Sequence, residues 1–310
     1  MRKRTASVLA VAAALLLPAA AAGQPAGENE FRTPWGDPDL MGTWSYASLT
    51  PLQRPESMAD KEFFTAEEAA ERNLAVTIDR DPPPGSVGSY NALWFDRGRV
   101  SSDMRTSLIV DPPNGRLPLR PETVEAQAAR RAYLRDHPAD SWLDRSSFDR
   151  CILGFNQGPP MTPGGYNQNM QLFQTEDHVV VLNEMVHDSR IIPIDGRARP
   201  GIDSWTGESR GRWEGDTLVV ETIDFSAKHS WRGTTPERHL IERFTRVDED
   251  TLVYEFTITD PATWTAPWTA QVPMRLNELP LFEYACHEGN YSMVNILGGA
   301  RALEAQADGR

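Results

Sequence analysis

Residues 239–259 read HLIERFTRVDEDTLVYEFTIT, and this stretch decides the fold class. Its second half alternates apolar and polar side chains with a period of two, which is typical of a β-strand with one buried face. The apolar positions are Leu252, Tyr254, Phe256 and Ile258. The Asp-Glu-Asp at 248–250 separates this strand from the apolar stretch before it. Because so short a connection leaves no room for a helical crossover, we expect the two strands to be antiparallel.

The strand expected at 239–247 has one polar face, which carries Arg238, Glu242 and Arg246. We therefore expect the opposite face to point into the protein, and that face carries His239, Ile241, Arg243 and Val247. A histidine and an arginine at inward positions are unusual in a structural core. This face is accordingly the first candidate for a functional site.

Short strands joined by tight turns continue on both sides of this hairpin. In the second half of the chain we expect strands at 168–174, 178–186, 190–194, 210–213, 217–224 and 269–276. In the first half of the chain we expect strands at 40–46, 90–95 and 106–110, helices at 65–73 and 121–137, and a loop at 79–89. Thr65 and Glu68 have the spacing of a capping box at the start of the first helix. A closing helix is expected at 289–301, interrupted by Gly298 and Gly299.

Many short antiparallel strands with one apolar face must close on themselves or stack, because an open sheet leaves bare edges. The pattern therefore predicts a mostly β protein, an antiparallel meander closed into a lipocalin-like barrel with a few peripheral helices. Gly42-Thr43-Trp44 resembles the Gly-x-Trp of lipocalin-type barrels, which implies that Trp44 plugs the closed end. An ordinary core position for Trp44 is the alternative. Residues 23–310 contain no low-complexity linker and are interpreted as a single domain.

Residues 1–22 have the layout of a cleavable signal peptide. Arg2, Lys3 and Arg4 precede an apolar run at 8–20, and small residues lead to an expected cleavage after Ala22. This run is shorter than the ~20 residues that a membrane-spanning helix needs. We therefore expect a mature protein in the periplasm or outside the cell, without membrane insertion.

The charge and the cysteines agree with this compartment. The formal net charge is −13 at pH 7, and loss of the three basic leader residues takes it to −16. Such a surface repels phosphate backbones and anionic lipid headgroups, so nucleic acid is not an expected partner. Cys151 and Cys286 are the two cysteines, and an oxidising compartment favours a disulfide between them. Two buried free thiols are the alternative, and no motif indicates an oligomeric state.

Six stretches together resemble a large family of exported bacterial proteins to which no activity is assigned. They are PDLMGTW at 38–44, NALWFDRG at 91–98, SLIVDPP at 107–113, EMVHDSRIIP at 184–193, WEGDTLVVET at 213–222 and YACHEGNY at 284–291. The resemblance spans nearly all of the mature chain. It implies export and one continuous domain, and it implies no catalytic residue.

Candidate catalytic residues have to come from side chains that meet in the folded chain, because the standard hydrolase, metalloprotease, nucleotide-loop and dithiol motifs are absent from the sequence. The first set is His239 and Arg243 with Tyr254 from the next strand, which together would stabilise an anionic oxygen beside a proton carrier. A buried histidine satisfied by hydrogen bonds is the alternative reading of His239.

The second set surrounds the second cysteine. His287 follows Cys286, and Glu283 and Glu288 flank it, so a disulfide-anchored histidine beside a carboxylate is a candidate general base. His187 is the third candidate, and a rim histidine bonded to the backbone is its alternative. We predict no cofactor, since His187, His239 and His287 contain no short ligand pair; a zinc ion on these three is the minor alternative.

Two functional hypotheses follow. In the first, the protein is an exported enzyme of the lyase, isomerase, hydratase or hydrolase type that acts by acid/base chemistry on a hydrophobic or aromatic small molecule in a barrel cavity. In the second, it is a non-catalytic carrier of apolar small molecules. Five tryptophans offer surface for ligand stacking, with core packing as the alternative: Trp205, Trp213, Trp231, Trp264 and Trp268. If the histidines and glutamates meet in one pocket, the enzyme hypothesis is favoured. If the cavity is purely apolar, the carrier hypothesis is favoured.

Overall fold

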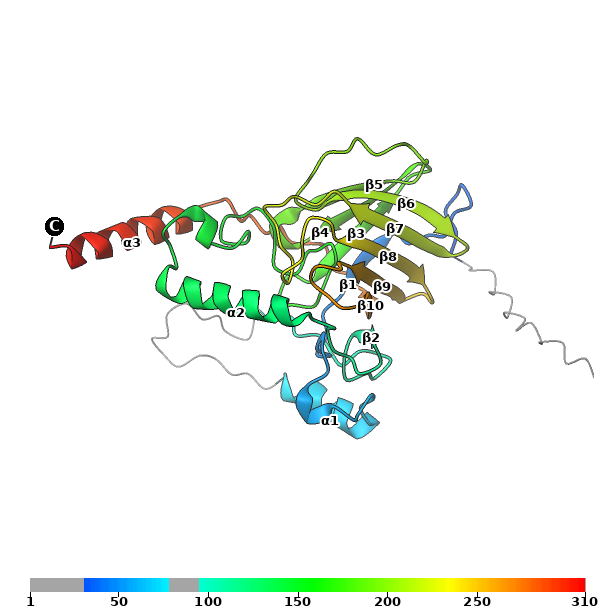
Figure 1. Ribbon diagram of the computed structural model, residues 1–310. Coiled ribbons are helices and arrows are strands. Elements are labelled where there is room, and N and C mark those ends of the chain that lie inside the picture. The colour runs from blue at the N-terminus through cyan, green and yellow to red at the C-terminus, as the bar shows by residue number, and fades with distance from the viewer. Residues whose placement is uncertain (1–30, 78–94, 310) are drawn as a thin grey trace, which may run out of the picture.

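The computed structural model describes residues 31–77 and 95–309. The expected signal peptide at 1–22, the expected loop at 79–89 and most of the strand expected at 90–95 lie outside the described residues. The chain forms a mostly β structure with helices at its periphery (Figure 1).

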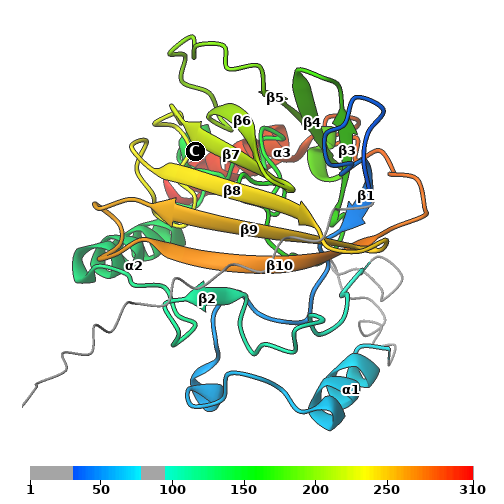
Figure 2. The same cartoon turned by 90° about the vertical axis from the view of Figure 1, so that its right-hand side faces the viewer.

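Ten antiparallel strands build the sheet. They are β1 (Gly42–Ser45), β2 (Ile109–Asp111), β3 (Asn169–Gln174), β4 (His178–Asn183), β5 (Ser189–Pro193), β6 (Glu208–Glu214), β7 (Thr217–Ile223), β8 (His239–Arg246), β9 (Thr251–Thr259) and β10 (Trp268–Leu276). Nine of them follow the order β5-β4-β3-β1-β10-β9-β8-β7-β6, and β2 pairs with β10 beside this path. Figure 2 shows β6 to β10 crossing one side of the molecule in that order.

The two ends of the nine-strand path meet, so the sheet curves into a nearly closed barrel. β5 contacts β6, and Gly211 of β6 lies against the side chains of Ile192 and Ile194. A Cβ at Gly211 would stand 2.7 Å from Ile194 Cγ2, so this seam depends on the missing side chain. The predicted antiparallel barrel is confirmed.

The inner face of β9 was correctly predicted, but the face of β8 was not. Leu252, Tyr254, Phe256 and Ile258 are fully buried. In β8, however, the buried residues are Leu240, Glu242 and Phe244, while His239, Ile241 and Arg243 lie on the outer face. The pairing explains the correction: Glu242 is opposite Phe256 and Phe244 is opposite Tyr254, and directly paired residues share a face of the sheet.

Large aromatic side chains fill the barrel interior. Trp44, Trp264 and Trp268 are fully buried, so core packing rather than exposed stacking surface is correct for Trp264 and Trp268. The Trp44 indole N–H donates to the Leu40 carbonyl oxygen at 2.9 Å. Trp264 and Trp268 pack edge to face with ring centroids 5.5 Å apart, and Trp231 stacks on Trp268 at 6.1 Å.

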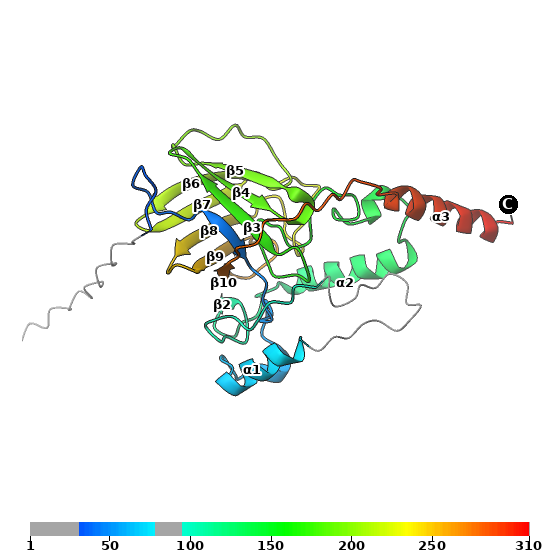
Figure 3. The ribbon, with the colours of Figure 1, turned by 180° about the vertical axis from the view of Figure 1, so that it is seen from behind.

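Three α-helices lie outside the barrel in the described part of the chain: α1 (Ala66–Ala75), α2 (Pro121–Asp136) and α3 (Ser292–Ala307). The capping box at α1 is confirmed, because the Thr65 hydroxyl accepts from the Glu68 N–H and the Glu68 carboxylate from the Thr65 N–H. The closing helix runs through Gly298 and Gly299 without interruption, contrary to expectation. α3 extends away from the barrel (Figures 1 and 3). Across residues 31–77 and 95–309, no helix is both long and apolar enough to cross a bilayer.

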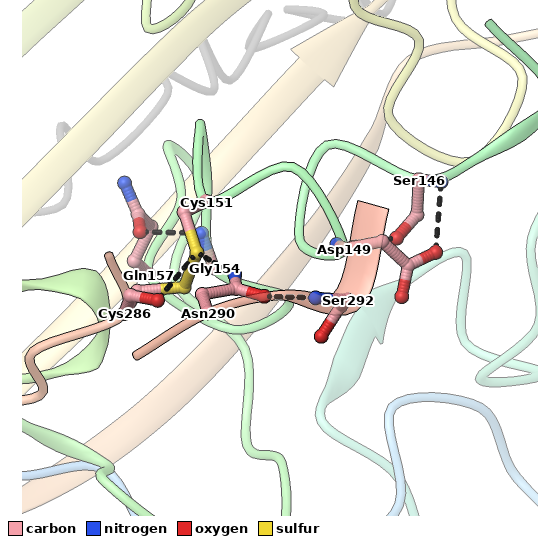
Figure 4. Close-up of a disulfide and its surroundings, with 8 residues drawn as sticks. All are labelled: Ser146, Asp149, Cys151, Gly154, Gln157, Cys286, Asn290 and Ser292. Atoms are coloured by element: carbon pink, nitrogen blue, oxygen red, sulfur yellow. Dashed lines mark hydrogen bonds between the residues drawn. A yellow bond between two sulfur atoms is a disulfide. The ribbon is translucent and has the colours of Figure 1, made fainter. Parts of the chain in front are cut away.

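A disulfide joins Cys151 to Cys286, as the sequence predicted, with 5.6 Å between the two Cα atoms. It ties the segment after β10 to the loop that precedes β3 (Figure 4). The Asn290 amide donates to Cys151 Sγ at 2.8 Å, and its carbonyl oxygen accepts the N–H of Ser292 at the start of α3. The bridge therefore fixes the chain between the barrel and the last helix.

Candidate functional site

A cavity of about 750 Å³ lies at the end of the barrel next to the disulfide-bridged segment. Its lining combines aromatic rings with amide and carboxylate groups: Phe95, Asp96, Tyr166, Asn167, Asn169, Glu184, Asn277, Leu279, Pro280, Phe282, Glu283 and Tyr284. We call this space the Glu184 cavity. Mixed apolar and convergent polar lining at this size is typical of small-molecule sites.

Three strand ends bring the polar side chains of the Glu184 cavity together. Asn169 begins β3, Glu184 directly follows β4, and Asn277 directly follows β10. The antiparallel register places these three ends side by side, since Ser45 pairs with Asn169 and Trp44 with Leu276. Asn277 therefore meets Asn169 at one end of the barrel although the two are 108 positions apart in the chain.

Neutral donors hold the carboxylate of Glu184, a residue that is only 3% exposed. The Asn169 amide donates to Glu184 Oε2 at 2.7 Å, and the Phe282 N–H donates to Oε1 at 3.3 Å. The Asn277 side-chain amide in turn donates to Asn169 Oδ1 at 3.0 Å, which orients the Asn169 side-chain amide. An ionised carboxylate has about four acceptor positions, so this carboxylate retains capacity for a ligand.

Aromatic rings form the other walls. Tyr166 packs edge to face with Phe95, at 6.3 Å between centroids, and stacks with Tyr284 at 6.5 Å. Phe155 packs edge to face on Tyr166, with 5.4 Å between centroids. The Arg97 guanidinium lies 4.6 Å from the Phe95 ring centroid, so one ring of the cavity wall already contacts a cation.

Two other hollows lack this combination. One of about 840 Å³ lies between α2 and the turn at 230–235, and Arg130, Arg131 and Arg232 contribute to its rim. Another of about 410 Å³ lies beside the ends of β9 and β10, near Asp250 and Glu278. The buried carboxylate distinguishes the Glu184 cavity from both.

The first predicted set is not brought together. His239 lies on the outer face of β8, where its Nε2 is 2.8 Å from Glu221 Oε1. This contact is the main reason why the pKa of Glu221 lies below its usual range. Arg243, on the same outer face, donates to Glu214 at 3.0 Å. The inward placement of His239 and Arg243 was wrong, because Glu242 rather than its neighbours occupies the interior.

Tyr254 does point inward, but its partners differ from those expected. Its hydroxyl donates to Glu242 Oε1 at 2.8 Å and accepts the Met161 N–H at 3.1 Å. Arg190 of β5 donates to both oxygens of Glu242, at 2.5 and 3.0 Å. Burial and the adjacent carboxylate raise the pKa of Tyr254, so this hydroxyl stays protonated. All of its contacts lie inside the packed core, which favours a structural role.

The second predicted set is only partly at the cavity. Glu283 lines the Glu184 cavity at its exposed rim. His287 and Glu288 are exposed beyond Cys286 and do not line it. His187 is also exposed, because the chain does not continue as a strand after Asn183. Instead it turns between β4 and β5, with positive φ at Val186 and His187.

The described ranges contain no group of three His, Cys, Asp or Glu side chains that could hold a metal ion. His187, His239 and His287 are therefore not gathered into the zinc arrangement that was the minor alternative. That the protein uses no cofactor stays a prediction.

Sequence reasoning missed Glu184, Asn169 and Asn277. Glu184 was assigned to a strand, in which its side chain would have faced away from His187. The signal that could have found these residues is positional: each polar residue stands next to a strand end, where loops of a barrel converge.

Comparison with protein-family models, with curated proteins and with solved structures found no match to this chain.

Proposed function

We propose that the protein is exported and binds an apolar or aromatic small molecule in the Glu184 cavity. One observation carries the proposal: the carboxylate of Glu184, a residue that is 3% exposed, lines a cavity of about 750 Å³ whose wall includes four aromatic rings. The rings offer stacking surface, and the carboxylate accepts a hydrogen bond from the ligand. Binding alone requires no further group, so a carrier is the function that the geometry supports best.

An acid/base enzyme is the second candidate, favoured by the same carboxylate. Glu184 is held in place by Asn169 and the Phe282 N–H, and such positioning suits a general base that abstracts a proton from a bound compound. The histidines first considered for this role do not line the cavity. In this version of the proposal, Glu184 replaces them.

A metabolite pull-down tests the binding proposal. Purified protein is incubated with extracts of the source cells and their medium, and retained compounds are identified by mass spectrometry. We expect aromatic or apolar compounds to be enriched by the natural protein and lost from Glu184→Gln. Glu214→Gln, which changes a carboxylate on the outer side of β6, is the matched control and should retain them. Equal retention by all three proteins, or by none, would contradict the proposal.

Turnover separates the two candidates. If a retained compound is chemically changed by the natural protein and unchanged by Glu184→Gln, the protein is an enzyme. If it is released unchanged, the protein is a carrier.

Export rests on the signal-peptide pattern of residues 1–22 and on the expected cleavage after Ala22. Expression of the full chain in a bacterial host, followed by intact-mass measurement of the periplasmic fraction, should give a protein that begins at Gly23. A full-length mass confined to the cytoplasm would contradict export.

A further inference from the structure

The charged residues that line the Glu184 cavity are all acidic, and the nearby Arg97 lies on the Phe95 ring outside that lining. Of the twelve lining residues, Asp96, Glu184 and Glu283 are carboxylates, and none is Lys, Arg or His. Asp96 and Glu283 are exposed at the rim, whereas Glu184 is buried deeper. The cavity therefore presents a negative potential that attracts cations and repels anions.

Glu184 differs from the other buried glutamate in how its charge is compensated. Glu242 is fully buried, and the Arg190 guanidinium neutralises it at 2.5 Å. Glu184 is 3% exposed, yet its hydrogen-bond donors in the described structure are the neutral Asn169 amide and Phe282 N–H. A buried carboxylate without a counter-charge is costly. A cationic ligand would supply the missing counter-charge to Glu184, whereas Arg190 already supplies it to Glu242.

Tyr46 gives a second sign that the polar groups here are incompletely satisfied. Its side chain is fully buried after β1, and its hydroxyl has no hydrogen-bond partner among the described residues. Tyr46 directly follows Ser45, which pairs with Asn169, so it lies at the same end of the barrel as Glu184 although it does not line the cavity. Burial raises the pKa of Tyr46, and the charge of Glu184 raises it further. An uncompensated carboxylate and an unused hydroxyl thus lie at the same end of the barrel.

The rings suit the same kind of ligand. Phe95, Tyr166, Phe282 and Tyr284 contribute four aromatic side chains to the wall. Ring faces attract cations, most strongly where water is excluded, and cages of aromatic rings with a carboxylate recognise ammonium groups. Arg97 on Phe95 shows this attraction at the cavity wall.

We propose that the ligand of the Glu184 cavity is a cation: an amine or quaternary ammonium group attached to an apolar or aromatic body. This inference rests on the proposed binding function and narrows it to one chemical class. The ammonium group lies against Glu184 and the rings, and the apolar body extends toward Leu279 and Pro280.

The test compares two probes of the same shape. Benzyltrimethylammonium is a cation, and neopentylbenzene has a carbon atom in place of its nitrogen and no charge. Both are titrated into the mature protein, and dissociation constants are measured by ligand-observed NMR. We expect the cation to bind about tenfold more tightly, since the aromatic rings and the buried Glu184 carboxylate both attract the charged probe and not its neutral counterpart.

Three variants locate the effect. Glu184→Gln should reduce the preference for the cation to about twofold or less. Glu283→Gln, at the exposed rim, should reduce it by about two- to threefold, and it keeps the test valid if Glu184→Gln does not fold. Glu214→Gln, outside the cavity, should leave the tenfold preference unchanged.

The outcomes separate this inference from the proposed function. Equal affinity for the two probes in the natural protein overturns the cation inference and leaves small-molecule binding standing. Binding of neither probe at millimolar concentration also overturns the inference, while the metabolite pull-down decides the proposed function on its own. A preference for the cation that persists in both glutamine variants of the cavity would show that the cation binds elsewhere.

Discussion

Arg190 of β5 and Glu242 of β8 form a buried ion pair inside the barrel, with Arg190 Nη1 2.5 Å from Glu242 Oε2. The side chains are 7% and 0% exposed. β5 ends one side of the nine-strand path and β8 is two strands from the other end, so the pair links the two sides of the seam from within. Tyr254 donates to the same carboxylate and anchors the Met161 backbone, which connects the loop before β3 to this network.

Removing one partner of this pair should destabilise the fold strongly. Arg190→Met leaves the Glu242 charge buried without compensation, which typically costs about 3 to 5 kcal/mol. The double variant Arg190→Met/Glu242→Leu should lose less than the single variant, because no orphan charge remains. Urea denaturation measures both. Arg243→Met, in the exposed pair with Glu214, is the control and should change little. A double variant less stable than the single one would refute the explanation by charge burial.

The two buried tyrosines should respond in opposite ways to loss of their hydroxyls. Tyr254→Phe breaks contacts to Glu242 and the Met161 N–H, and should cost about 1 to 3 kcal/mol of unfolding free energy. Tyr46→Phe removes a buried hydroxyl without a partner among the described residues, so stability should be unchanged or rise by up to about 2 kcal/mol. Denaturation midpoints of the two variants give the comparison. A marked loss in Tyr46→Phe would mean that this hydroxyl has a partner.

Acid should destabilise the protein through His229. Burial, together with the charge of Arg238, lowers the pKa of His229 from 6.5 to about 4. Above pH 6.5 the His229 imidazole is neutral in both the folded and the unfolded state, so its protonation takes nothing from the free energy of unfolding. As the pH falls toward 4, His229 is protonated in the unfolded state before it is protonated in the folded state. The free energy of unfolding therefore decreases, by an amount on the order of 3 kcal/mol.

The measurement is the unfolding free energy at pH 7 and pH 4.5 for the natural protein and His229→Gln. The variant should lose less stability on acidification, because its side chain does not titrate. His287→Gln, at an exposed position, is the matched control. Equal acid losses in the natural protein and His229→Gln would argue against the lowered pKa.

The disulfide should contribute to stability through the long loop that it closes. Cys151 and Cys286 are 135 positions apart, and for a loop of this length the chain-entropy model predicts a contribution of about 5 kcal/mol. The variant Cys151→Ser/Cys286→Ser should therefore unfold at much lower denaturant concentration. Intact-mass analysis with and without reductant confirms the bridge in the natural protein. Two thiols that are freely alkylated in the native oxidised protein would contradict it.

The sequence determined the fold class because strand signals are local. The alternation of Leu252, Tyr254, Phe256 and Ile258 follows from the two-residue period of the backbone, and the acidic turn at 248–250 follows from chain geometry. β9 lies at the predicted residues 251–259. The disulfide and the capping box at Thr65 were also correctly predicted, because each depends on only two residues whose pairing follows from their chemistry.

The tertiary structure alone decided which polar residues are inside. By itself, Glu242 has the character of a surface residue, and only Arg190 from a distant strand and Tyr254 make its burial tolerable. This long-range compensation reversed the predicted face of β8 and placed His239 and Arg243 outside. The candidate site has the same origin. The β3–β4 hairpin brings Asn169 and Glu184 together. Asn277 joins them because β1 aligns the ends of β3 and β10, and no local pattern encodes that long-range register.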